Sequence, residues 1–311
     1  MRTALVNYED TDGILKCTLN VDQHNNEVRG LKSLTIAPWL TLTLKIPYIM
    51  AAFQTNDGYH CLVMNMLKGY SLREHMSMIP GYQKDFAITE IAHYLSGALI
   101  KAHSYGFAHG NITPDTVYIR HHEYCGFEIL FVNAEGLQPL LDHPQATPFK
   151  PEGYAPPEDF VESESDQRRR DAWMLGATLY SLTNGHPPYG FAYSESHRAM
   201  LPVPAEELQR TMKQVAETGK NSYPPIQTSN SHLLRMIEDL LKPKPEDRIT
   251  VGTAKIRARI GLEEDIPLKN RICENLDYLK SLLPIVGTPS WQVEPPLREH
   301  VEDTSTRYKN P

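Results

Sequence analysis

Residues 109–119 read His-Gly-Asn-Ile-Thr-Pro-Asp-Thr-Val-Tyr-Ile. Before this stretch, residues 91–103 carry apolar side chains at helical spacing, which predicts a long helix that leads into it: Ile91, Leu95, Leu99 and Ala102. After it, residues 117–119 and 129–132 flank a polar segment that contains Gly126, a pattern typical of a β-hairpin. The stretch is therefore predicted to be a loop between a helix and a hairpin.

This order of elements, and the loop itself, resemble the catalytic loop of protein kinases, H-R-D-L-x-x-x-N. His109 keeps the first position of that pattern, and Gly110 stands where the kinases have Arg. The resemblance places Asn111 at the Asp that accepts the substrate proton and Thr116 at the Asn that holds magnesium. Thr113 stands where a Lys commonly lies near the transferred phosphate. Because an amide cannot accept a proton as a carboxylate does, we expect a degenerate loop without catalytic residues.

The magnesium-binding D-F-G segment should follow the second strand of the hairpin. Counting forward from Gly126 places Asn133 at the Asp position, whereas alignment on Gly136 places Ala134 there. Neither register supplies an aspartate, so we expect no metal site. Glu135 could replace the missing ligand, but a lone carboxylate in a turn is more often simply solvated.

Four later segments resemble kinase landmarks in family order: Tyr-Ala-Pro-Pro-Glu at 154–158, Asp-Ala-Trp-Met-Leu-Gly at 171–176, Gly-His-Pro-Pro-Tyr at 185–189 and Lys-Pro-Glu-Asp-Arg-Ile-Thr at 244–250. The resemblance implies that Glu158 pairs with Arg248 and that Asp171 accepts hydrogen bonds from the catalytic-loop backbone. Trp173 and Gly176 belong to the same helix start as Asp171. We therefore expect these five residues to be structural.

The N-terminal part departs furthest from the kinase pattern. Residues 61–72 resemble the fifth strand, the hinge and the next helix start, with Met64 near the gatekeeper position. No G-x-G-x-x-G phosphate loop can be written with the glycines before this segment, which are Gly13, Gly30 and Gly58. Lys16 and Glu27 are weak candidates for the nucleotide-binding ion pair. Alternatively, Lys16 lies on a half-buried strand and extends its amine to solvent.

Together these resemblances imply an α+β, bilobal, protein-kinase-like fold. We expect a reduced N-lobe of sheet and one helix in residues 1–66 and a mainly helical C-lobe in residues 67–261. Residues 262–311 are predicted to form a C-terminal helix, with apolar side chains at helical spacing in 268–283, followed by an extended tail.

Composition excludes some classes of partner. The formal net charge is -7, which disfavours a nucleic-acid surface, and the basic run at 168–170 is predicted to be a solvated patch. No apolar stretch is long enough to span a membrane. The N-terminus does not have the pattern of a signal peptide.

The four cysteines lack the spacing of a metal site. Cys17 and Cys61 fall in predicted strands, where buried thiols are expected. Cys125 and Cys273 fall in a predicted turn and a late helix, and the sequence leaves open whether they form a disulfide.

Residues 147–158 and 171–182 resemble the secreted rhoptry-type kinases of apicomplexan parasites, several of which have degenerate catalytic loops. This resemblance implies a secreted pseudokinase of the parasitophorous vacuole or cyst wall. We expect a non-enzymatic scaffold or allosteric regulator that binds no cofactor and engages a protein partner, for example an active kinase. The alternative is an enzyme with unorthodox or residual nucleotide-dependent transferase activity, based on Lys16, Glu27 and Glu135.

Overall fold

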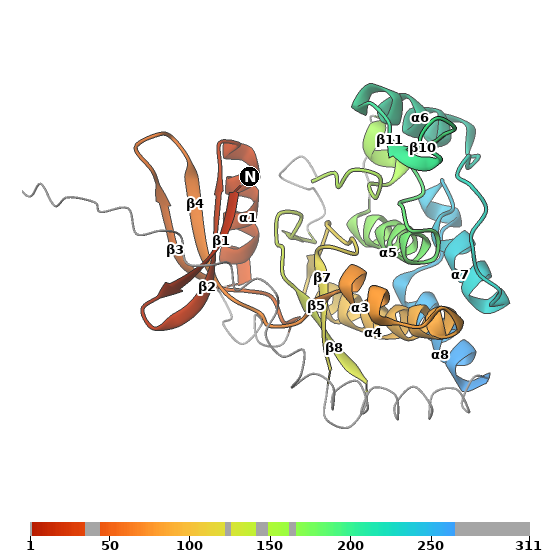
Figure 1. The fold of residues 1–311 in the computed structure, drawn as a ribbon, viewed down its shortest axis with the longest axis horizontal. Coiled ribbons are helices and arrows are strands. Elements are labelled where there is room, and N and C mark those ends of the chain that lie inside the picture. Colours follow the sequence, from red (N-terminus) through yellow and green to blue (C-terminus); the bar gives the residue numbers. More distant parts are fainter. Residues whose placement is uncertain (1, 35–43, 122–125, 141–148, 162–165, 265–311) are drawn as a thin grey trace, which may run out of the picture. The chain divides into compact units, whose positions relative to one another are not determined.

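A four-stranded antiparallel sheet with one helix forms the N-terminal lobe (Figure 1). The computed structural model describes residues 2–34, 44–121, 126–140, 149–161 and 166–264. The strands are β1 (Arg2–Tyr8), β2 (Thr11–Thr18), β3 (Ile49–Gln54) and β4 (His60–Asn65), in the order β1-β2-β4-β3. Helix α1 (Val21–Leu34) buries Leu31 and Leu34 in the core and contacts β2, β3 and β4.

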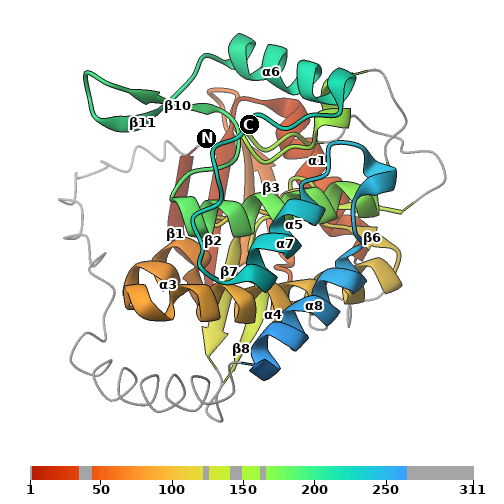
Figure 2. The same cartoon turned by 90° about the vertical axis from the view of Figure 1, so that its right-hand side faces the viewer.

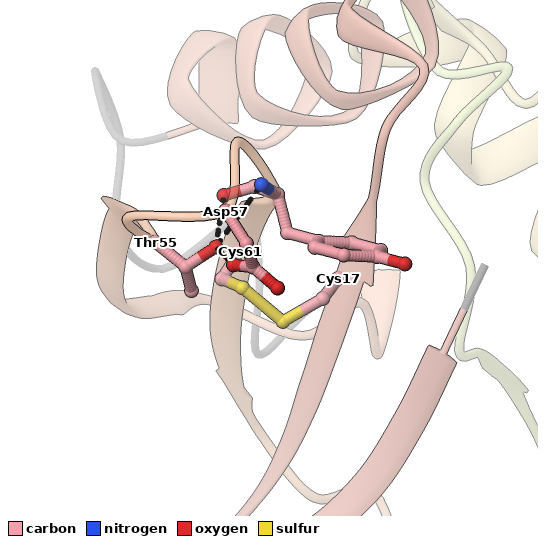
Figure 3. Close-up of a disulfide and its surroundings, with 5 residues drawn as sticks. Cys17, Thr55, Asp57 and Cys61 are labelled. Carbon is pink, nitrogen blue, oxygen red and sulfur yellow. Dashed lines mark hydrogen bonds between the residues drawn. A yellow bond between two sulfur atoms is a disulfide. The ribbon is translucent and has the colours of Figure 1, made fainter.

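A disulfide joins β2 to β4 in this lobe (Figure 3). Cys17 and Cys61 are directly opposite each other in the antiparallel register, and their Cα atoms are 4.2 Å apart. The prediction of two buried thiols is therefore wrong, because the chain pattern did not show that the register places both side chains on one face. The Cys125–Cys273 pairing lies outside the described residues.

The C-terminal lobe is built around helix α5 (Gln167–Asn184), which is buried along most of its length. Helices α4 (Lys84–Ser104) and α7 (Ser231–Leu240) pack against α5, and α8 (Val251–Glu264) packs against α4 (Figure 2). The other elements of this lobe are β5 (Tyr70–Ser71), α3 (Leu72–Met78), η1 (Gly81–Gln83), β6 (Phe107–Ala108), β7 (Val117–His121), β8 (Phe127–Phe131), β9 (Gln138–Pro139), η2 (Pro157–Phe160), β10 (Phe191–Ser194), β11 (Ala199–Pro202), α6 (Ala205–Thr218) and η3 (Pro245–Asp247).

Local sequence explains where α5 lies and how it packs. Asp166 caps its N-terminus by accepting a hydrogen bond from the Arg168 N–H, and Gly185 ends it in a left-handed conformation. Trp173 is fully buried, and a Cβ added to Gly176 would lie 2.7 Å from the Leu240 Cβ. The close approach of α5 to α7 therefore requires glycine at position 176.

The α+β, two-lobed fold predicted from the sequence is confirmed. The predicted helix at 91–103 is the second half of α4, and the predicted hairpin is β7–β8. The β10–β11 hairpin was not predicted. No helix among the described residues is long and apolar enough to cross a membrane. The helix predicted from the apolar spacing at 268–283 lies outside the described residues.

Two buried ion pairs connect the segment around η2 to the rest of the C-terminal lobe. Arg248 donates to both oxygens of Glu158 at 2.9 and 3.0 Å, and its guanidinium lies 5.1 Å from the centre of the Trp173 ring. Arg248 also donates to three backbone carbonyls, those of Arg169, Lys242 and Pro243. Arg170 is fully buried and donates to Asp159 at 2.7 and 2.5 Å. The prediction of a solvated patch at 168–170 is therefore wrong for Arg170.

Removal of either member of the Glu158–Arg248 pair should destabilise the fold. We expect Glu158→Ala and Arg248→Ala each to lower the free energy of unfolding by about 3–5 kcal/mol, because one buried charge loses its partner. Arg248→Ala should be the costlier change, since three carbonyls also lose a donor. The double variant should cost less than the sum. Urea denaturation, with the exposed Glu206→Ala as control, measures these effects.

Candidate active site

The loop between β6 and β7 passes very close to the segment that follows β8. Gly110 has φ of +66°, and a Cβ built on it would lie 2.3 Å from the backbone oxygen of Gly136. The loop therefore has no room for a side chain at position 110. This is a physical reason for glycine where the kinase pattern has arginine.

A buried carboxylate on α5 fixes the start of this loop. The two oxygens of Asp171 accept hydrogen bonds from the backbone N–H groups of His109 at 2.9 Å and Gly110 at 2.8 Å. The ring of His103, near the end of α4, lies 2.8 Å from the same carboxylate. Burial would raise the pKa of Asp171, but the hydrogen bond and charge of His103, the charge of His109 and the Gly110 N–H together lower it. The carboxylate thus remains ionised and holds the loop backbone.

Hydroxyl groups hold the rest of the loop. The Thr116 Oγ1 donates to the Asn111 backbone oxygen at 2.7 Å, and it accepts from the Thr113 N–H at 3.0 Å. Thr178 of α5 donates to the backbone oxygen of Ile112 at 2.9 Å. Asn111 is buried. The side chains at the positions of the kinase Lys and Asn therefore contribute to the shape of the loop.

Lys16, Glu27 and Glu135 meet at the other side of the site, where β2, α1 and the turn after β8 converge. The Lys16 Nζ lies 2.7 Å from the Glu27 Oε1 and 3.5 Å from the Glu135 Oε1. The side chain of Lys16 is 11% exposed, so it does not extend to solvent as the alternative prediction had it. Burial raises the pKa of Glu27, although Lys16 opposes the shift. The structure thus brings together the two residues predicted to form the ion pair, Lys16 and Glu27, and the alternative metal ligand, Glu135.

Glu135 is buried, and the prediction of a solvated side chain is wrong. Its N–H donates to the Asn133 Oδ1 at 2.9 Å, and the Asn133 Nδ2 lies 3.3 Å from its Oε1. Ala134 is buried and contributes only its backbone, whose N–H bonds to Glu27. Among the three positions that follow Val132, the one that reaches Lys16 is therefore Glu135. The adjacent Gly136, packed against Gly110, is the sequence signal that could have indicated a turn buried in this way.

The strand that carries Lys16 differs in its order from the strand that carries the phosphate-binding Lys of protein kinases. In protein kinases the phosphate-binding Lys is on the third strand, and the glycine-rich loop precedes it. Here Lys16 is on β2, the second strand of the sheet, so β1 corresponds to the second strand of those kinases. The turn between β1 and β2, Glu9-Asp10, contains no glycine.

Oxygen ligands of the kind that magnesium prefers are few in this site. In the described ranges no group of three or more His, Cys, Asp or Glu side chains is placed to hold a metal ion. Glu135 offers a carboxylate, and Asn133 and Asn111 offer amide oxygens. A magnesium ion that also takes oxygens from a nucleotide needs only one or two such ligands from the protein. The residues present thus fit a nucleotide-bound magnesium through Glu135.

Comparison with known proteins gives one family and several distant relatives. A family model described as the protein kinase domain matches residues 22–257. The mouse MAP kinase-activated protein kinase 5 is 24% identical over 215 residues, which are 61% of this chain and 41% of that protein. The MAP kinase-activated protein kinase mak-1 of Caenorhabditis elegans is 26% identical over 234 residues, 70% of this chain and 40% of that protein. The calcium-dependent protein kinase 11 of Oryza sativa subsp. japonica is 22% identical over 232 residues, 71% of this chain and 36% of that protein.

The chain thus spans about two fifths of the length of the curated relatives it matches. These matches contradict the prediction that the chain is not an enzyme, because the family and the named relatives are kinases. The prediction followed from the residue types at positions 111, 113 and 116 of the loop.

The buried His109 should make stability depend on pH. Its ring packs 4.3 Å from that of Phe131, and burial lowers its pKa to about 4, although Asp171 opposes the shift. Between pH 6.5, the ordinary value, and about 4, the unfolded chain binds a proton that the folded chain does not. Stability is therefore lost as the pH falls through this window, by about 1.4 kcal/mol per pH unit.

Urea denaturation from pH 7 to pH 4.5 of the wild type and of His109→Asn measures this contribution. We expect a flatter dependence in the variant, since Asn keeps an acceptor but does not titrate. The exposed His197→Asn should leave the dependence unchanged. Parallel curves for the wild type and His109→Asn would contradict the assignment.

Proposed function

Because the chain belongs to the protein kinase domain family, we propose that it transfers a phosphoryl group from a nucleoside triphosphate to a hydroxyl acceptor at a low rate. The observation that carries the proposal is the Lys16 cluster, made of Lys16, Glu27 and Glu135. In it the largely buried Lys16 amine contacts Glu27 at 2.7 Å and Glu135 at 3.5 Å. In active kinases the Lys–Glu ion pair between strand and helix must be in place.

Each residue of the cluster has a distinct role. Lys16 would bind phosphate oxygens while Glu27 keeps its amine oriented. Glu135 would ligate magnesium, and the bound ion would neutralise the charge that develops on the transferred group. The Lys16–Glu135 contact is the longer of the two, so Lys16 can exchange it for a phosphate oxygen without losing Glu27.

Asn111 is the reason why the rate of phosphoryl transfer should be low. An amide can orient an acceptor hydroxyl, but it cannot remove its proton at neutral pH. General-base catalysis contributes about 10²–10⁴-fold to a rate, whereas most of the catalysis in phosphoryl transfer comes from positioning and electrostatics. A site that keeps positioning and electrostatic stabilisation but lacks a general base would be slow without being inactive.

Nucleotide binding and turnover test this proposal directly. We expect ATP with magnesium to raise the melting temperature by mass action, and we expect Lys16→Met to abolish the shift. Glu135→Gln should weaken the magnesium dependence, and Asn111→Asp should raise the rate of phosphate transfer to a protein or peptide acceptor. The exposed Lys220→Met is the matched control. No shift with millimolar ATP and magnesium would refute the proposal.

A second role, binding and regulation of a protein partner, is favoured by the loop itself. Thr113 and Thr116 hydrogen-bond within the loop, so the fold maintains the shape of the loop whether or not phosphate is transferred. The partner proposed from the sequence is another protein, for example an active kinase. Regulation of this kind should survive Lys16→Met, which removes phosphate binding. An effect on the partner's activity that is lost in Lys16→Met would attribute regulation to phosphoryl transfer instead.

We also propose the rhoptry-type subfamily and a secreted location, in line with the resemblance of residues 147–158 and 171–182. A disulfide such as Cys17–Cys61 is usual in oxidising compartments and rare in the cytosol, which supports that location. Alkylation of free thiols under denaturing conditions, in protein taken directly from its cells, would find Cys17 and Cys61 protected. Labelled Cys17 and Cys61 would argue against an oxidising compartment.

A further inference from the structure

The Cys17–Cys61 disulfide lies one residue from the amine of the candidate active site. In the β2–β4 register, Lys16 is opposite Leu62, and Cys17 is opposite Cys61. Lys16 reaches Glu27 on α1, and Leu62 belongs to the core. Since successive side chains of a strand point to opposite faces, the disulfide is on the sheet face that is turned away from α1.

The same disulfide connects the strand of Lys16 to the strand that leads into the hinge. At the far end of these strands the Met66 N–H donates to the Asp12 oxygen at 3.0 Å. Beside the disulfide, β4 begins after a turn in which the Thr55 hydroxyl bonds Asp57 (Figure 3). The disulfide is thus the covalent tie at the end of β2 that is nearest to Lys16.

The two cysteines differ in exposure. Cys17 is partly exposed, whereas Cys61 is fully buried. The disulfide has two neighbours across the sheet, and both are exposed. Arg2 of β1 is opposite Cys17, and Phe53 of β3 is opposite Cys61. A thiolate can therefore approach the disulfide at the Cys17 sulfur.

We propose that Cys17–Cys61 is a reversible redox site that controls the position of Lys16, and thereby the affinity of the site for a nucleoside triphosphate. The proposal rests on the proposed nucleotide function. The reductant is a dithiol: one thiolate attacks the Cys17 sulfur and releases the Cys61 thiolate, and the second thiol displaces Cys17. Two electrons and two protons pass to the cysteines, and the dithiol leaves as its own disulfide.

Reduction of the disulfide should change the position of Lys16 for a steric reason. Two thiols need more room than a disulfide, because non-bonded sulfur atoms cannot approach as closely as bonded ones. Cys61 is fully buried and Cys17 is partly exposed, so the space comes from movement on the Cys17 side, on β2. Lys16 is the next residue on β2, and its 3.5 Å contact with Glu135 is already long. In the reduced protein the Lys16 amine is less well oriented. The free energy needed to order it on binding therefore lowers the affinity for the nucleotide.

The test compares oxidised protein with protein reduced by dithiothreitol, at a temperature at which circular dichroism shows both to be folded. We expect reduction to weaken ATP–magnesium binding about tenfold, which corresponds to about 1.4 kcal/mol. Hydrogen exchange in residues 11–34 should rise at the same time. Reoxidation should reverse both changes.

Variants separate this disulfide from the other cysteines. Cys17→Ser with Cys61→Ser should behave like the reduced protein and should not respond to dithiothreitol. Cys125→Ser with Cys273→Ser should respond as the wild type does. Equal affinity and equal exchange in the oxidised and reduced wild type would overturn the redox site. A change in exchange without any ATP binding in either state would retain the redox site and refute the nucleotide function.

Discussion

The buried carboxylate of Asp171 is the interaction on which the geometry of the loop depends. Backbone N–H groups of His109 and Gly110 and the ring of His103 converge on it, so that α4, α5 and the loop share one charge. A buried charge is tolerated only with such partners. Because two of the three partners are backbone groups, the anchor is independent of the side chains at positions 111 and 116. The loop can therefore keep its shape while its reactive groups change.

Sequence patterns predicted the C-terminal lobe because its landmarks are short segments with local physical signals. The helical spacing before His109 and the hairpin after it each lie within about a dozen residues, and the two-lobed fold followed from their order. The contacts that were not predicted have no such local signal. Cys17 and Cys61 are 44 residues apart, and Lys16 and Glu135 are 119 residues apart. Strand register and burial decide these contacts, and neither can be derived from one segment.

The candidate site shows the same division. Lys16 and Glu27 could be proposed because they lie on consecutive elements, a strand and the helix that follows it. The role of Glu135 depended on burial of its turn, which is fixed by the packing of Gly136 against Gly110. Seen without that packing, a carboxylate in a turn looks solvated. Loss of the aspartate at position 111 was visible in the sequence, but its consequence depended on residues far away.

Charge balance in the Lys16 cluster explains why rigidity of β2 matters. Two buried carboxylates face one amine, and burial together with the charge of Glu135 raises the pKa of Glu27. Under the proposed function, Lys16 turns toward a phosphate oxygen by giving up Glu135, whose carboxylate then needs another cation. Such an exchange requires a side-chain movement of a few torsions, provided that the backbone of Lys16 stays fixed. The hydrogen-bonded register with β4 and the neighbouring disulfide supply that fixed point, so the electrostatics of the site depend on the mechanics of the sheet.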